Sequence, residues 1–132
     1  MQLYLLAEHT KIYFNLICRA FKAIEDFFRR PYVATSWSNL GAAWDSKGDY
    51  DKAIGYYEKA LASDLKSLGS GHPSVARDWN NLGAAFYNKK EYARALSYFE
   101  KARMVWVKAG LGHNVKAVDQ WIASTKKAMA SR

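Results

Sequence analysis

Apolar and polar positions alternate along the chain with the period of an α-helix. Apolar side chains recur three or four positions apart over residues 33–47, and again over about residues 50–68. This spacing places them along one face of a helix, so each stretch is predicted to be an amphipathic helix. Gly48 and Asp49 separate the two stretches, as expected where one helix ends in a glycine and the next begins at an N-cap.

The same pattern then returns as a second unit. Aligning residues 33–74 with residues 75–116 pairs Trp37 with Trp79, and Trp121 follows Trp79 at the same interval. The second unit predicts two more helices: residues 73–88 and residues 91–109. A repeat with a period of roughly 20 to 50 residues consists of units that cannot bury their apolar faces alone. The units must therefore stack, and the predicted fold class is all-α.

The positions shared by the two units resemble the tetratricopeptide-repeat (TPR) signature. The matching residues are Trp37-x2-Leu40-Gly41-x2-Trp44 with Ala53-x3-Tyr57-x2-Ala60, and Trp79-x2-Leu82-Gly83-x2-Phe86 with Ala95-x3-Phe99-x2-Ala102. The 42-residue period and the glycine-rich connector over residues 68–73 are similar to the kinesin-light-chain type of TPR. This resemblance implies a helical-hairpin solenoid with two full repeats.

Gly41 and Gly83 fall inside predicted helices, where a glycine costs about 1 kcal/mol relative to alanine. We expect this loss where the two helices of a hairpin approach closely. The expected facing positions are alanines, with aromatic side chains filling the remaining space: Ala53, Ala60, Ala95 and Ala102, then Trp44, Tyr57, Phe86 and Phe99.

The repeats divide one domain into four segments. We expect an N-terminal amphipathic helix over residues 1–32, TPR 1 over residues 33–74, TPR 2 over residues 75–116 and a capping helix over residues 117–132. Beyond Trp121 the expected Leu-Gly pair is replaced by Ser-Thr. A single terminal helix with a polar outer face is what a solenoid needs to cover its last apolar surface.

The N-terminal helix has an apolar arc that is too wide for one neighbouring hairpin to cover. A large exposed apolar surface usually marks an interface, so we predict self-association through residues 1–30. The side chains expected at this interface are Tyr13, Leu16, Ile17, Phe21, Ile24 and Phe28.

The TPR resemblance also implies a concave groove, lined by the first helix of each hairpin, that binds peptides. The residues so implied are Thr35, Ser38, Asn39, Ala42 and Asp45 in TPR 1, Arg77, Asn80, Asn81, Ala84, Tyr87 and Asn88 in TPR 2, and Asp119, Ile122 and Lys126 in the terminal helix. Asn39 and Asn81 are of most interest, because an amide side chain can both accept from and donate to a peptide backbone. The alternative is that each asparagine ties adjacent repeats together.

The formal charge of +8 is uneven, with +5 carried by the second repeat. A basic surface attracts acidic proteins or nucleic acid without specificity, and a solvated helical face explains most of it. Arg77 and Lys126 would favour an acidic peptide. Nucleic-acid binding is the less favoured alternative and rests on Trp106 beside Arg103 and Lys108, because single-strand binding uses aromatics next to basic residues.

No catalytic or metal-binding pattern is found. The histidines are His9, His72 and His113, without metal-ligand spacing, and a single cysteine, Cys18, excludes an intrachain disulfide. The apolar run over residues 12–18 is too short to span a membrane and lacks a signal-peptide pattern. We therefore expect no enzyme activity, no metal, no cofactor, no membrane partner and a cytoplasmic location.

Together these features favour a non-enzymatic adaptor or scaffold that binds a protein or peptide partner in the groove. The alternative is a structural unit that oligomerises through its N-terminal helix.

Overall fold

The computed structural model describes the backbone of residues 2–131 and the side chains within that range except those of residues 27–32. The described chain is all-α, and its helices are α1 (Gln2–Ser46), α2 (Tyr50–Leu68), α3 (Pro73–Asn88), α4 (Tyr92–Lys108) and α5 (Gly112–Ala130).

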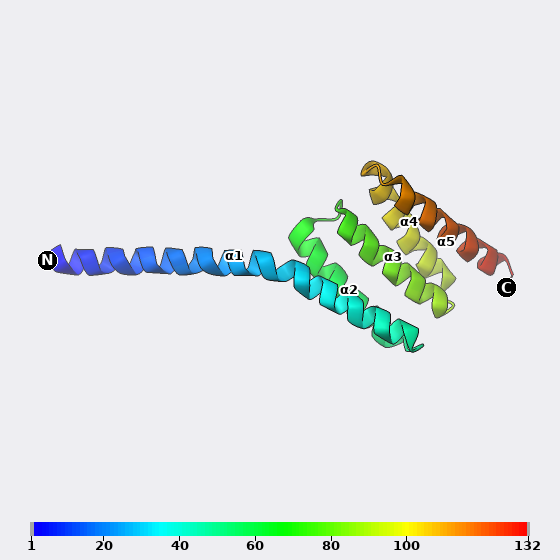
Figure 1. The fold of residues 1–132 in the computed structure, drawn as a ribbon, viewed down its shortest axis with the longest axis horizontal. Coiled ribbons are helices and arrows are strands. Elements are labelled where there is room, and N and C mark those ends of the chain that lie inside the picture. Colours follow the sequence, from blue (N-terminus) through cyan, green and yellow to red (C-terminus); the bar gives the residue numbers. More distant parts are fainter. Residues whose placement is uncertain (1, 132) are drawn as a thin grey trace.

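The helices stack in chain order as two hairpins and a final helix. The second half of α1 packs against α2, α3 packs against α4, and α5 packs mainly against α4. Figure 1 shows α3 between the α1–α2 hairpin and the α4–α5 pair, while the first half of α1 extends away from the others. The fold is therefore the TPR solenoid that the sequence predicts.

Local capping explains where the inner helices begin. The Asp49 carboxylate accepts a hydrogen bond of 3.2 Å from the backbone N–H of Lys52, which confirms the predicted N-cap of α2. At the start of α3, Nδ1 of His72 accepts from the backbone N–H of Ser74 at 3.1 Å. Pro73 follows as the first helical residue, where its missing N–H costs nothing.

The two hairpin turns share one conformation but not one residue type. Gly48 ends the first helix of TPR 1 at φ +84°, in the left-handed region that glycine adopts without strain. Lys90 holds the equivalent place in TPR 2, one full repeat later, at φ +68°. A lysine at this angle carries a steric cost of about 1 kcal/mol that glycine avoids.

The N-terminal helix and the first helix of TPR 1 are one element. The sequence predicts a separate helix before residue 33, but α1 continues through Pro31 to Ser46. An interior proline removes one backbone hydrogen bond and bends a helix without always ending it. Figure 1 shows α1 changing direction between its extended half and its packed half.

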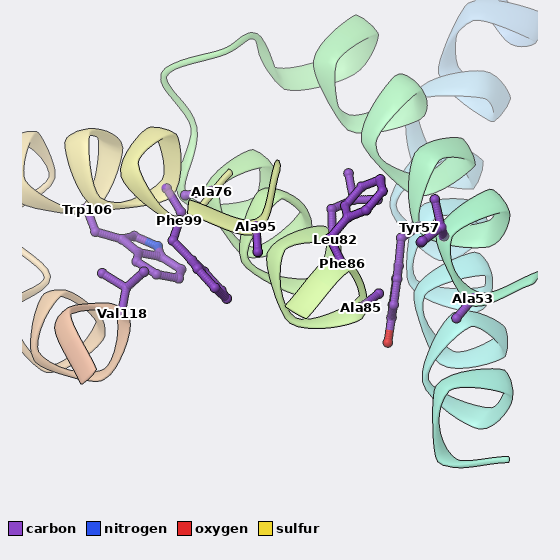
Figure 2. Packing of buried hydrophobic residues seen from close by; sticks show 12 residues of the cluster. Ala53, Tyr57, Ala76, Leu82, Ala85, Phe86, Ala95, Phe99, Trp106 and Val118 are labelled. Carbon is purple, nitrogen blue, oxygen red and sulfur yellow. The ribbon is translucent and has the colours of Figure 1, made fainter. Parts of the chain in front are cut away.

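Twelve buried apolar side chains form one core that runs from α2 to α5. Figure 2 shows Leu82 and Phe86 of α3 directed toward Tyr57 of α2, and Val118 of α5 beside Trp106 of α4. The repeats thus share their apolar surfaces across each junction, which is why neither hairpin is expected to fold alone.

The interior glycines allow close helix contact, as predicted, but the neighbour is an aromatic ring. A Cβ built on Gly41 would lie 2.7 Å from the ring of Tyr57, and one built on Gly83 would lie 2.6 Å from the ring of Phe99. Each ring therefore sits directly on the glycine. The facing alanines Ala53 and Ala95 are fully buried in the same hairpins.

The last helix begins before the predicted segment boundary at residue 117, at Gly112. It turns Val118 and Thr125 inward, both fully buried, and Trp121 stacks on Phe99 of α4 with ring centroids 5.4 Å apart. The exposed side of α5 includes Lys116, Gln120, Ser124 and Lys127.

Candidate protein-interaction surfaces

The first helices of the two repeats, α1 and α3, are joined through three of the predicted groove residues, Ser38, Asp45 and Asn88. The described side chains include two hydrogen bonds between these helices. Nδ2 of Asn88 donates to Oδ1 of Asp45 at 3.0 Å, and Oγ of Ser38 donates to Oδ1 of Asp78 at 3.5 Å. We call the side of α1 and α3 that carries the predicted TPR 1 and TPR 2 groove residues the α1–α3 face.

Asn39 and Asn81 of this face make no side-chain hydrogen bond to other described residues. Asn39 is exposed and Asn81 is half-buried, and within the described part of the chain neither amide has a hydrogen-bond partner. The tie between adjacent repeats is made instead by Asn88 and Ser38. The two asparagine amides are thus available to a ligand.

The remaining predicted residues on the α1–α3 face differ in exposure. Four are exposed: Thr35, Ala42, Arg77 and Asn88. Five are half-buried: Ser38, Asp45, Asn80, Ala84 and Tyr87. Tyr87 makes edge contacts with Tyr92 and Trp121, each at 5.4 Å between ring centroids, so aromatic packing fixes it at the end of α3 that lies near α5.

The three groove residues predicted in α5 have different surroundings. Asp119 accepts a 2.6 Å hydrogen bond from Nε of Arg103, which places it against α4. Ile122 is half-buried against the core, and Lys126 is exposed. Asp119 therefore lies beside α4, while Trp121 of the same helix contacts both Tyr87 of α3 and Phe99 of α4.

A pair of buried carboxyl groups lies behind the α1–α3 face, and sequence reasoning missed it. Asp78 of α3 and Asp64 of α2 are 1% and 4% exposed. The pKa of Asp78 is raised to about 7, mainly by burial and also by the neighbouring Asp64 carboxyl, while Arg77 and the hydrogen bond from Ser38 act to lower it. The sequence contained one sign of this pair. Asp64 aligns with Trp106 of the second repeat, and an acidic side chain is unusual at a core position.

A separate hollow of about 670 Å³ lies between the end of α4 and the start of α5. Its apolar lining includes Trp106, Val107, Leu111 and Val115. Trp106 is only 5% exposed and belongs to the core. It therefore offers no stacking platform beside Arg103, and the nucleic-acid alternative loses the residue on which it rests.

The first half of α1 is exposed along its length. Of the six side chains predicted at a self-association interface, Phe28 lies outside the described side chains, and the other five are between 55% and 68% exposed: Tyr13, Leu16, Ile17, Phe21 and Ile24. Figure 1 shows this half projecting from the helical stack. We call residues 2–26 the arm.

The described residues carry neither a membrane-spanning helix nor a cluster of metal ligands. Residues 2–131 contain no helix whose length and apolar character suit a membrane crossing. Among the side chains that the structure places, no three His, Cys, Asp or Glu groups gather as metal ligands would.

Comparison with known proteins identifies the repeat. The profile of the tetratricopeptide-repeat family matches residues 32–104. A crystal structure of BtubC (BKLC) from P. vanneervenii, a kinesin-light-chain-like protein, is similar with a TM-score of 0.60 and 28% sequence identity. The alignment covers 74% of this chain and 43% of BtubC, so the chain spans less than half the length of that relative. Curated protein sequences give no significant match.

TPR domains generally mediate protein–protein interactions. The paired helices, the ring-on-glycine contacts and the family match agree on one assignment. The chain belongs to the tetratricopeptide-repeat family, and it is similar to the kinesin-light-chain-like protein BtubC.

Proposed function

We propose that this protein is a non-enzymatic adaptor that binds an extended peptide segment of a partner protein on the α1–α3 face. One observation carries the proposal: Asn39 and Asn81 lie on adjacent, hydrogen-bonded helices and have no hydrogen-bond partner among the described residues. Each amide can accept from a peptide N–H and donate to a peptide carbonyl. Two such groups can hold a backbone without reading its side chains.

The surroundings of the two asparagines suit a ligand backbone of acidic character. Ala42 is exposed and Ala84 half-buried, and these small side chains leave room for close approach. Arg77 is exposed on the same face, and Lys126 is exposed on α5. Rim charges of this kind raise the association rate and bias partner choice more than they add affinity.

Peptide-library selection on the purified protein tests the proposal. The same selection is run on the Asn39→Ala/Asn81→Ala double variant, after circular dichroism shows that its helicity is unchanged. We expect an enriched motif, with acidic positions, that the double variant loses. A Ser131→Ala variant, altered at an exposed site beyond α5, is the matched control and should keep the motif. Enrichment that ignores the two asparagines would contradict the proposal.

A second role, as an assembly unit, is favoured by the exposed arm. Its large apolar side chains are at least 55% exposed. Such a surface usually marks an interface. We propose self-association through this segment as the alternative function, and light scattering at tens of micromolar protein tests it directly. A monomer under those conditions would exclude it.

A further inference from the structure

The arm combines high apolar exposure with a formal charge of zero. Leu3, Leu6, Phe14 and Phe21 are between 64% and 84% exposed. The charged residues of the arm are three acidic and three basic: Glu8, Glu25 and Asp26, then Lys11, Arg19 and Lys22. The whole chain carries +8, so all of its net charge lies outside the arm. Two copies can therefore meet arm to arm without charge repulsion.

Five of the large exposed apolar residues of the arm lie on one heptad stripe. A stripe with alternating spacings of four and three runs through Leu3, Ala7, Thr10, Phe14, Ile17, Phe21 and Ile24. This spacing is that of a coiled-coil seam, in which each side chain packs between side chains of a facing helix. No other described helix covers the stripe, because α1 contacts the stack through its second half (Figure 1).

The charge of the rest of the chain favours an antiparallel pair. Two bodies that each carry +8 repel one another, and a parallel pair would place both at the same end. An antiparallel pair places them at opposite ends of the arms, beyond a Debye length of about 8 Å at physiological salt. A rise of about 1.5 Å per residue gives the 25-residue arm a length of roughly 37 Å, several times that screening distance.

We propose that the arms of two copies form an antiparallel coiled coil centred near residue 19. This inference rests on the second proposed role, self-association, and adds its geometry. In this register Phe14 packs against the partner subunit's Ile24, and Ile17 packs against the partner subunit's Phe21. In the four layers between residues 14 and 24 an aromatic side chain then faces a branched aliphatic one, which fills this part of the seam without placing two rings opposite each other.

The flanks of the seam fit the same register. On one side Lys11 lies opposite the partner subunit's Glu25, and symmetry gives this ion pair twice. On the other side Ala20 lies opposite the partner subunit's Ala20, where small side chains let the helices approach. A register displaced by one heptad would instead place Lys11 opposite the partner subunit's Cys18, and both ion pairs would be lost.

Charge reversal tests the register. Lys11→Glu should raise the dissociation constant of the dimer roughly ten-fold, because two attractive pairs become repulsive. Adding Glu25→Lys should restore the original value. Lys22→Glu, which makes the same charge change away from the seam, is the matched control and should have little effect. Sedimentation equilibrium of the full chain gives the constants, and circular dichroism confirms that helicity is retained.

Cys18 provides an independent readout of the centre. It is exposed, and in this register it flanks the seam beside the partner subunit's Cys18. A short bismaleimide should therefore join two copies efficiently, and the Ile17→Asp variant, which cannot form the seam, should lose the product.

Two outcomes would overturn the proposal in different ways. A dimer whose constant does not recover in the Lys11→Glu/Glu25→Lys double variant contradicts the antiparallel register while leaving self-association in place. A monomer at tens of micromolar protein contradicts both the register and the second role. Neither outcome bears on peptide binding by the α1–α3 face.

Discussion

At the scale of single residues, the contacts of a few side chains set the spacing of the solenoid. The rings of Tyr57 and Phe99 rest on Gly41 and Gly83 at distances that leave no space for a Cβ. The sequence indicated the close approach, because an interior glycine is otherwise a loss for a helix. It did not reveal that the neighbour is an aromatic ring, since that depends on how the helices are rotated about their axes.

Gly83→Ala is expected to destabilise the protein. The new Cβ would lie 2.6 Å from Phe99, which is fully buried and cannot move away. Overpacking costs about 1–3 kcal/mol, and better helix propensity returns about 1 kcal/mol. We expect a net loss of up to about 2 kcal/mol in the free energy of unfolding by urea. Gly55→Ala is the matched control, because nothing lies within 4 Å of its added Cβ, and it should gain stability. Equal effects at the two sites would contradict the packing described.

The buried Asp78 predicts a dependence of stability on pH. Its folded pKa of about 7 lies above the ordinary value of 3.8. The protonated folded form is therefore favoured, and its stabilisation is complete below pH 3.8 and lost as the pH rises to about 7. Between these two values the slope of the loss is at most about 1.4 kcal/mol for each unit of pH.

Asp78→Asn, which mimics the protonated acid, should remove this loss. We expect the variant to be more stable than the parent at pH 8, with the difference shrinking or reversing at pH 5. Thermal unfolding at several pH values measures it. Asp119→Asn, at an exposed and paired carboxylate, should show no comparable trend. A constant difference for Asp78→Asn across pH 5–8 would show that the carboxyl titrates normally.

At the scale of helices, local signals predicted the inner elements well. Gly48 marks the end of α1, and Asp49 and Pro73 mark the starts of α2 and α3, each to within two residues. The outer elements departed from prediction for physical reasons. Pro31 does not end α1, because one missing hydrogen bond is tolerated inside a long helix. The rotation of α5 follows from packing against α4, and the repeat pattern could not supply it.

Lys90→Gly tests the turn between α3 and α4. Lysine at φ +68° is strained and glycine is not, so the variant should gain about 0.5–1 kcal/mol in the free energy of unfolding. The reverse change, Gly48→Lys at the equivalent turn of TPR 1, should lose a similar amount. Chemical denaturation of both variants measures the effects. A loss of stability in Lys90→Gly would mean that the lysine side chain contributes more than its backbone costs.

At the scale of the whole molecule, two candidate surfaces lie on different parts of the chain. The α1–α3 face belongs to the packed repeats, and the arm projects from them (Figure 1). The residues of both surfaces were predicted from the sequence. The sequence could not predict that Asn88 would bridge to Asp45, which leaves Asn39 and Asn81 without partners in the described structure, because such bonds depend on the spacing between stacked helices.

Chemical-shift mapping with an isotope-labelled protein tests the central claim most directly. The peptide enriched by selection is titrated into the protein while backbone and side-chain amide signals are followed. The account predicts that the largest changes fall on the side-chain amides of Asn39 and Asn81 and on their neighbours in α1 and α3. Changes confined to residues 2–26, or to the hollow between α4 and α5, would contradict it.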